Sequence, residues 1–351
     1  MEVMVMMHKL LCILLVLLLL LPCGLSETGD EGVTILITAV GDCTLGGVAN
    51  HTAASEKLFD QSVRKNGMEW FLSGVKPLFE QDDFTIVNLE GPLTTATQYE
   101  ETAKFYFRGK PEYTAILTSA SVEIANVANN HSHNFRDEGF DETVSVLKEA
   151  GIGVCGYENE YYTEVRGVTV GFLGFDQWRS TDAQMKAQTQ AAREKCDLLI
   201  VSYHGGVENN YSMSAEVEHA GKLLIDAGAD LVIGNHSHVY GGMRLYKGKY
   251  ITGSLGNFCF GGNTAPKDYS CIVFRQAFTV YPDGRVEDAG IDIIPAQVGS
   301  RKKVNDYHPT LLAPGYDADS LFKAVLSRSN FQAKNVTWLE DSYALLNGLN
   351  K

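Results

Sequence analysis

The sequence is short of positive charge. Its 29 Lys and Arg stand against 43 Asp and Glu, which gives a net charge of −14 at pH 7, and the basic residues are scattered along the chain. A protein that binds nucleic acid or an anionic membrane surface needs a basic patch to neutralise phosphates. We therefore expect no nucleic-acid partner.

Metal-binding cysteine motifs, internal repeats and low-complexity linkers are also absent. No Cys-x-x-Cys or Cys–His spacing of the zinc-ribbon type occurs, which excludes a structural zinc finger. Two of the seven cysteines, Cys12 and Cys23, lie near the N-terminus, so an odd number is left for the rest of the chain. Cys259 and Cys271 flank a predicted hairpin and could pair, but spacing alone leaves this open.

A long apolar run occurs only at the N-terminus, in residues 10–21 after Lys9. As a helix these residues rise only ~18 Å, which is short for a bilayer. We interpret residues 1–26 as a secretory signal peptide, with Gly24 to Ser26 as small residues for cleavage, or as a membrane anchor. A lipid-modified Cys23 and a cytosolic helix are the alternatives. The bulk of the chain is predicted to be exported, to the cell surface or beyond it.

The remaining sequence alternates between apolar runs of strand length and helical patterns. Strands are predicted at 33–40, 84–88, 122–128, 167–175, 197–203, 229–234 and 250–258, with a hairpin at 271–295. Helices are predicted at about 55–79, 111–120, 137–151, 182–195 and 213–227. This order indicates an α/β fold with a mostly parallel sheet and helices on its faces. Residues 296–351 are expected to add two helices, around 318–328 and 337–348, that pack on the domain.

Polar side chains follow five of these strands at their carboxyl ends. Such ends meet at one edge of an open parallel sheet, where ligands bind. Carboxylates, amide oxygens and imidazoles suit Mn, Fe or Zn. The residues are Asp42, Glu90, Asn130 with His131, His204, and His236 with His238. Each alone could be a helix cap, a turn residue or a structural histidine; their coincidence at five strand ends favours a metal site.

Six motifs in this order carry a family resemblance: GDCTLGG, NLEGPL, ANNHSHNF, HGGVEN, GNHSHV and SLGNFCF. Over residues 33–262 they resemble the CapA family of poly-γ-glutamate capsule synthesis proteins, which is similar in fold to the calcineurin-like metallophosphoesterases. The resemblance implies a four-layered α/β/β/α sandwich for a domain at residues 33–295. It also implies one or two divalent metal ions as cofactors.

The resemblance assigns roles to the strand-end residues. It implies Asp42 and His238 on the first metal, Glu90 as the bridging carboxylate, Asn130, His204 and His236 on the second metal, and His131 as general acid. Glu208 would contact the ligands or the substrate. Asn257 would line the cleft or only form a turn that packs Phe258 into the core. Thr44 stands where the phosphoesterases have a histidine, which puts the first metal in doubt.

Three functions remain open from the sequence. The first is an exported protein of capsule or poly-γ-glutamate biosynthesis whose metal site acts on an anionic polymer, through amide or phosphate chemistry, beside membrane-bound capsule machinery. Such a substrate needs local positive charge, for which Arg108, Lys110, Arg179 and Arg244 are candidates. The second is an extracytoplasmic metallophosphoesterase acting on a phosphate ester. The third is a non-catalytic, membrane-anchored binding or scaffold protein.

Overall fold

The computed structural model describes residues 31–49, 55–100, 104–332, 336–339 and 342–345. The predicted signal peptide or anchor at residues 1–26 lies outside the described residues, so it stays a prediction. Within the described part of the chain, no helix is both long and apolar enough to cross a membrane.

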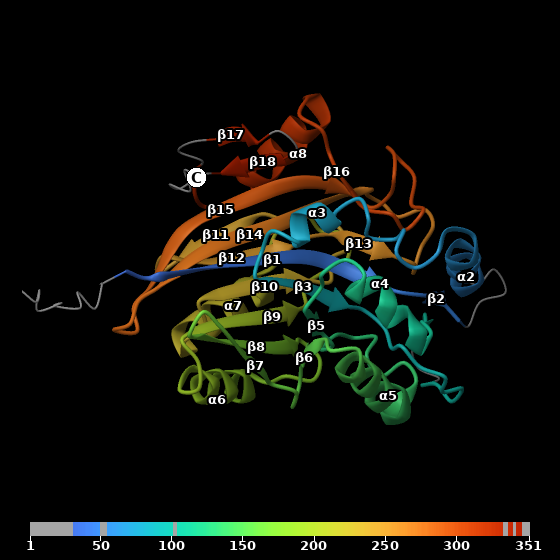
Figure 1. Ribbon diagram of the computed structural model, residues 1–351, viewed down its shortest axis with the longest axis horizontal. Helices are drawn as coiled ribbons and strands as arrows, with labels where there is room; N and C mark the ends of the chain where they lie inside the picture. The colour runs from blue at the N-terminus through green and yellow to red at the C-terminus, as the bar shows by residue number, and fades with distance from the viewer. Residues whose placement is uncertain (1–30, 50–54, 101–103, 333–335, 340–341, 346–351) are drawn as a thin grey trace, which may run out of the picture.

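The first of two large sheets has the strand order β17-β18-β15-β14-β1-β3-β5-β6, with β13 beside β1 and β16 beside β15 (Figure 1). Strands β1, β3, β5, β6 and β13 pair in parallel, whereas β14 and β15 form the predicted antiparallel hairpin. The strands are β1 (Val33–Thr44), β3 (Phe84–Leu89), β5 (Ile124–Asn126), β6 (Gly153–Cys155), β13 (Asn257–Phe260), β14 (Ser270–Val280), β15 (Val286–Gln297), β16 (Thr310–Leu311), β17 (Val336–Leu339) and β18 (Ser342–Leu345).

The second sheet has the order β11-β12-β10-β9-β8-β7. Its four inner strands run parallel, and β7 and β11 are antiparallel edges. The strands are β7 (Tyr161–Val165), β8 (Val168–Asp176), β9 (Leu198–His204), β10 (Leu231–Asn235), β11 (Met243–Tyr246) and β12 (Lys249–Ser254). A small separate pair joins β2 (Gly47–Val48) to β4 (Phe107–Arg108).

Among the described helices, all but the last cover the outer faces of the two sheets, whereas the last packs through Leu321 and Phe322 on the cluster between them. The helices are α2 (Ser55–Asn66), α3 (Lys76–Phe79), the 3-10 turn η1 (Pro111–Tyr113), α4 (Thr114–Thr118), α5 (Arg136–Glu149), α6 (Asp182–Arg193), α7 (Ala215–Ala227) and α8 (Tyr316–Ser327). Helices α2 to α5 pack on the first sheet, as the cluster of Phe79, Leu117 and Leu147 with Val87 shows. Helices α6 and α7 pack on the second sheet, mainly through Met185, Leu224 and their neighbours.

A third apolar cluster fills the space between the two sheets. It joins Ile37 and Ile86 of the first sheet to Phe172 and Ile200 of the second. Because strands such as β3 and β9 are buried along their whole length, they carry continuous apolar runs rather than alternation. Two helical layers around two packed sheets make the α/β/β/α sandwich, which confirms the predicted fold class.

Three local predictions were wrong. The helix expected at 55–79 stops at Asn66, because Gly67 takes a φ of +78° that favours glycine and ends the helix. The second C-terminal helix, expected at 337–348, is replaced by strands β17 and β18. The apolar run 250–258 divides into β12 and β13, which belong to different sheets.

The cysteines in the described residues are all free thiols. Cys259 and Cys271, the pair left open by the sequence, are both fully buried in the cluster under α3 and α4. Burial raises their pKa values well above that of an ordinary thiol. They therefore act as small apolar side chains in the core.

Candidate metal centre

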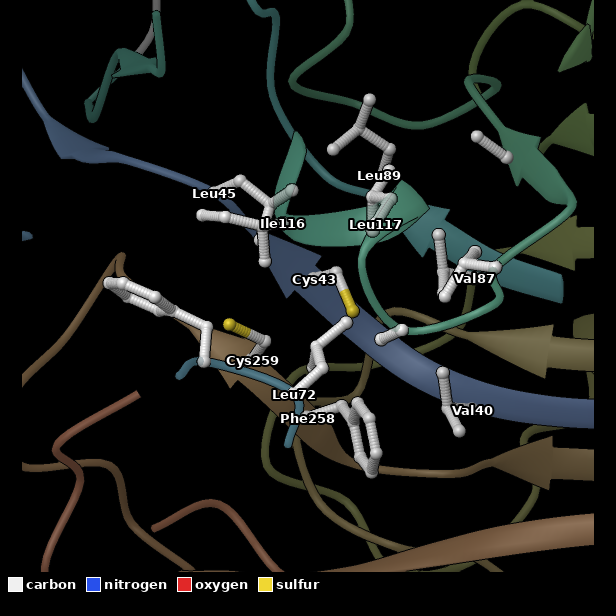
Figure 2. Packing of buried hydrophobic residues seen from close by; sticks show 14 of the residues in the cluster. Val40, Cys43, Leu45, Leu72, Val87, Leu89, Ile116, Leu117, Phe258 and Cys259 are labelled. Atoms are coloured by element: carbon white, nitrogen blue, oxygen red, sulfur yellow. The ribbon is translucent and has the colours of Figure 1, made fainter. Parts of the chain in front are cut away.

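The polar residues predicted at the strand ends meet at one edge of the sandwich. Strand alternation explains their direction, because neighbouring side chains point to opposite faces. Cys43, Leu89 and Phe258 point into one apolar cluster (Figure 2). Their sequence neighbours Asp42, Glu90 and Asn257 are polar and equally buried. The core on one side thus fixes the polar groups on the other.

Glycines allow the close approach that this edge requires. Strand β1 passes β13 so tightly that a Cβ at Gly41 would lie 1.8 Å from the carbonyl oxygen of Gly256. That same carbonyl accepts a hydrogen bond from the Asp42 backbone N–H at 2.9 Å. Any larger side chain at position 41 would therefore push Asp42 out of place.

Glu90 is shared by two groups of potential ligands. In each of two sets, Glu90 with His204 and His236, and Asp42 with Glu90 and His238, the ligand atoms lie within 4.8 Å of one another. Glu90 Oε1 is 3.8 Å from His204 Nε2, and Glu90 Oε2 is 3.7 Å from His238 Nδ1. A carboxylate placed between two such sets is the arrangement that a pair of bridged cations requires.

Three of the four carboxylate oxygens of this cluster lack hydrogen-bond partners among the described residues. Within the described residues, neither Glu90 oxygen nor Asp42 Oδ2 accepts a hydrogen bond, although both side chains are fully buried. Leaving buried carboxylates unsatisfied is unfavourable by several kcal/mol in general. A divalent cation would satisfy all three oxygens, so the donor set fits a metal site.

An amide network holds His204 in its orientation. Asn88 Nδ2 lies 3.1 Å from His204 Nδ1 and donates to Asp42 Oδ1 at 2.8 Å. Asn126 in turn donates to Asn88 Oδ1 at 2.8 Å. On the other side of the ring, Asn130 Oδ1 lies 2.8 Å from His204 Nε2, so Asn130 does reach the cluster.

The loop after β10 places two histidines by an unusual backbone conformation. His236 has a φ of +105° and His238 a φ of +58°, values that residues other than glycine rarely adopt. Such strain of about 1–3 kcal/mol for each residue persists where the fold imposes it, and it is concentrated at functional sites. His236 Nδ1 lies 3.2 Å from His204 Nε2, and His238 Nδ1 lies 3.0 Å from Asn257 Oδ1. Asn257 thus contacts the cluster through His238, while Phe258 packs into the core.

Burial and mutual charge set the pKa values. Burial raises the pKa of Glu90 to about 8. Burial would lower the pKa of His238, but the charges of Glu90 and Asp42 outweigh it and raise that pKa to about 10. Burial together with His238 lowers the pKa of His236 to about 4, and burial also puts the pKa of His204 well below its usual value. His204 and His236 are therefore neutral, which is the form of imidazole that binds cations, whereas His238 would release a proton when it binds one.

His131 lies at the rim of the cluster with one nitrogen directed at it. Asn134 Oδ1 accepts from the Phe107 backbone N–H at 2.8 Å and lies 2.9 Å from His131 Nδ1. Because that oxygen is an acceptor, His131 Nδ1 carries the proton and Nε2, which is 4.0 Å from Glu90 Oε1, presents a lone pair. Burial lowers the pKa of His131 to about 4. The ring is thus neutral, and it must accept a proton before it can act as the general acid expected from the resemblance.

Glu208 is exposed, as is Asn130, whereas the other predicted site residues are buried or half-buried. No ligand group of the cluster lies within ion-pair distance of it among the described residues, but its charge affects the pKa values of Glu90 and His238. Glu208 therefore lies near the cluster without belonging to it.

Sequence reasoning missed three residues of this site: Asn88, Asp176 and Trp178. The Trp178 ring centroid is 4.8 Å from that of His236, edge to face, and Trp178 is 48% exposed. Asp176 Oδ1 accepts from the Trp178 and Arg179 backbone N–H groups at 2.8 and 2.6 Å, which fixes this loop. Asp176 directly follows the apolar run of β8, so the strand-end rule could have found it.

Comparisons with known proteins agree with the resemblance read from the motifs. The capsule biosynthesis protein CapA of Bacillus anthracis is 27% identical over 309 residues, 78% of this chain and 70% of that protein. The PGA biosynthesis protein CapA of Bacillus subtilis (strain 168) is 26% identical over 289 residues, 75% of this chain and 73% of that protein.

The solved structures that superpose on this chain have a lower sequence identity to it. The NAD nucleotidase of Haemophilus influenzae superposes with a TM-score of 0.46 at 13% identity, covering 89% of this chain and 65% of that one. A phosphatase from Mycoplasma pneumoniae has a TM-score of 0.45 at 14% identity, covering 75% of this chain and 94% of that one. Similarity at this level says nothing about chemistry.

The family profile gives the firmest assignment. The profile described as bacterial capsule synthesis protein PGA_cap matches residues 36–262, a range that holds every residue of the cluster. This chain belongs to the PGA_cap family of bacterial capsule synthesis proteins.

Proposed function

We propose that this protein is an exported, metal-dependent enzyme of capsule or polyglutamate biosynthesis that acts on an anionic polymer such as poly-γ-glutamate. One observation carries the metal-dependent part: Glu90 is fully buried between two ligand sets, and neither of its oxygens has a hydrogen-bond partner among the described residues. The polymer is suggested by the names of the two Bacillus relatives, which describe capsule and PGA biosynthesis.

The residues that would hold the cations divide into two sets that share Glu90. Asp42 and His238 belong to one set, and His204 and His236, with the amide oxygen of Asn130 nearby, belong to the other. One or two ions of Mn, Fe or Zn suit these oxygen and nitrogen donors. When bound, such ions supply Lewis acidity and make water a nucleophile near neutral pH.

The chain's own acid–base group is His131. Its Nε2 would take a proton from the attacking water and pass it to the leaving amine. The new C–O bond forms as the amide C–N bond breaks, which leaves a carboxylate and an amine. Proton transfer by a positioned side chain is worth about 10²–10⁴-fold in rate. Asn134 supports this role because it holds the proton on Nδ1.

Hydrolysis of a phosphate ester is the second candidate function. It is favoured by the shared Glu90, since paired cations also stabilise the oxygens of a phosphoryl group during displacement. The same leaving-group protonation by His131 would apply. The two reactions differ in the bond that breaks, so one assay design separates them.

The test is turnover in the presence of Mn²⁺. The protein is incubated with poly-γ-glutamate, and new amino groups are counted with an amine-reactive dye; an aryl phosphate ester is assayed in parallel. We expect release of amino groups by the wild type and by His219→Gln, whose ring lies exposed on α7, and none by Glu90→Gln. Release of phenol alone would move the proposal to phosphate esters. If neither substrate reacted, the proposal of a metal-dependent hydrolase would be refuted.

Export and a partnership with membrane-bound capsule machinery belong to the same proposal. Their support is the apolar run at residues 10–21 in the sequence. Mass spectrometry of the protein recovered from whole cells tests this: a mature chain that begins near residue 27, outside the cytoplasm, is expected. A full-length chain in the cytoplasm would contradict it.

A further inference from the structure

The protein has a net charge of −14, so it needs a local positive charge to bind a polyanion. Three of the four cations singled out in the sequence are already engaged. Arg108 pairs with Glu56 at 3.0 Å, Lys110 with Asp60 at 2.8 Å, and Arg244 with Glu218 at 3.1 Å. Arg179 is the fourth. Within the described residues its guanidinium makes no ion pair and no hydrogen bond, and the side chain is exposed.

Arg179 is held at a fixed place although its side chain is free. Its backbone N–H donates to Asp176 Oδ1, and the hydroxyl of Tyr157 donates to Asp176 Oδ2 at 2.5 Å. The same hydroxyl lies 3.0 Å from the carbonyl oxygen of Asn129, next to the predicted ligand Asn130. Asp176 and Tyr157 therefore tie the Arg179 loop to the metal centre.

A cavity of about 360 Å³ opens beside this loop. Its lining includes Arg179, His133, Glu158, Gln184 and Gln188. We call it the Arg179 cavity. Trp178, the neighbour of Arg179, contacts His236 at 4.8 Å between ring centroids, so the cavity and the metal centre lie on either side of one short loop.

His133 also lines the cavity, and its Nε2 lies 3.8 Å from the exposed Asp137 carboxylate. Its ring stacks on Phe140 at 4.4 Å between centroids, and its Nδ1 is buried with no hydrogen-bond partner in the described part of the chain. Burial lowers the pKa of this ring, and the charge of Arg179 lowers it further, so the two groups are close. A neutral ring has one N–H to donate.

We propose that the Arg179 cavity binds a carboxylate of the substrate, with the Arg179 guanidinium and the His133 ring as its donors. The proposal rests on the proposed function, because it anchors one unit of an anionic polymer while a neighbouring unit lies at the metal centre. An arginine fork and a carboxylate match in geometry, and a charge-assisted pair of this kind is stronger than a neutral hydrogen bond.

Glu158 allows a second test of the proposal, in which the expected change in affinity is opposite to that at Arg179. This exposed acid also lines the cavity, and it opposes an anionic ligand. Removing its charge should therefore tighten binding, whereas removing the charge of Arg179 should weaken it. A ligand that carried a positive charge instead would respond in the opposite sense to both changes.

Equilibrium binding of γ-linked tetraglutamate to the metal-free protein, which should not hydrolyse the peptide, is measured by calorimetry to test this. We expect Arg179→Gln to raise the dissociation constant roughly fivefold to tenfold, as the loss of one charged hydrogen bond does at an open site. Glu158→Gln should lower it by about twofold. The matched control is Arg285→Gln in the β14–β15 turn, which removes the same charge and should leave binding unchanged. Equal binding by Arg179→Gln and Arg285→Gln would overturn the proposal.

A second probe separates this idea from the proposed function. If the wild type does not bind tetraglutamate, the proposed polymer substrate fails. The cavity is then judged with glutarate, a dicarboxylate that has no amide, on metal-free protein. The Arg179 Nε–H signal in the NMR spectrum should shift on titration with millimolar glutarate, and Glu158→Gln should enhance the shift. An unmoved signal would overturn the carboxylate site itself.

Discussion

Replacing Glu90 by Gln should abolish the stabilisation of this protein by divalent cations. The substitution keeps the shape of the side chain but removes the one carboxylate that belongs to both ligand sets. A cation present at a hundredfold excess over its dissociation constant adds about 2.7 kcal/mol to the free energy of unfolding. Two cations would add about 5 kcal/mol, and at about 2 °C per kcal/mol for a chain of this size the melting temperature would rise by about 10 °C.

Without cations, the variant and the wild type should differ little. The Glu90→Gln variant no longer buries a carboxylate with a raised pKa, which stabilises it, but its His238 loses the partner that raises the pKa of that ring to about 10. These effects oppose each other. The difference between the two proteins should therefore appear only when metal is added.

Thermal unfolding followed by circular dichroism, in EDTA and in excess Mn²⁺, measures both effects. Glu208→Gln is the matched control, because Glu208 is an exposed acid near the cluster that belongs to neither ligand set. The control should show the full rise in melting temperature. A rise in Glu90→Gln equal to that of the wild type would refute the shared-carboxylate reasoning.

Three further predictions follow from buried charges and thiols. In EDTA, the free energy of unfolding should be greatest near pH 6.5. Below this pH the unfolded chain binds protons that three buried histidines of the folded chain do not bind, and above it Glu90 and His238 of the folded chain keep protons that the unfolded chain has released. A chemical denaturation series in which the stability rose steadily from pH 5 to 9 would contradict this. The three histidines are His131, His204 and His236. Arg275→Ala should cost about 3 kcal/mol in urea unfolding, because it leaves Asp292 buried without its counter-ion, and a loss below about 1 kcal/mol would speak against a buried pair. Four buried thiols should react with Ellman's reagent only after unfolding, and fast labelling of the native protein would contradict the packing; they are Cys43, Cys155, Cys259 and Cys271.

The strand ends were predictable because their signal is local. An apolar run that stops at a polar residue identified Asp42, Glu90 and His204, and the parallel order of the strands implied that they converge. Asp176 directly follows the apolar run predicted at 167–175, but none of the six motifs contains it. Its role depends on Tyr157, a contact far along the chain that no local pattern contains.

Other features depend on packing and had no local signal. The free state of Cys259 and Cys271 is decided by which side chains surround them, not by their spacing. The strand β17 is an exception, because Val336, Thr337 and Trp338 are residue types that favour strands, and the predicted helix overlooked that local signal. The pairing of β18 with β15 outweighed the helical pattern there. The strained backbone of His236 likewise follows from its loop and not from its residue type.

The central claim is that buried acids and imidazoles from distant strands hold divalent cations together. Elemental analysis of the purified protein, after dialysis against Mn²⁺ and then buffer, tests it most directly, with His236→Ala compared with His219→Gln on the surface of α7. The account predicts one or two equivalents of metal in the wild type and in His219→Gln, and loss of most of it in His236→Ala. Equal metal content in all three proteins, or none in the wild type, would contradict it.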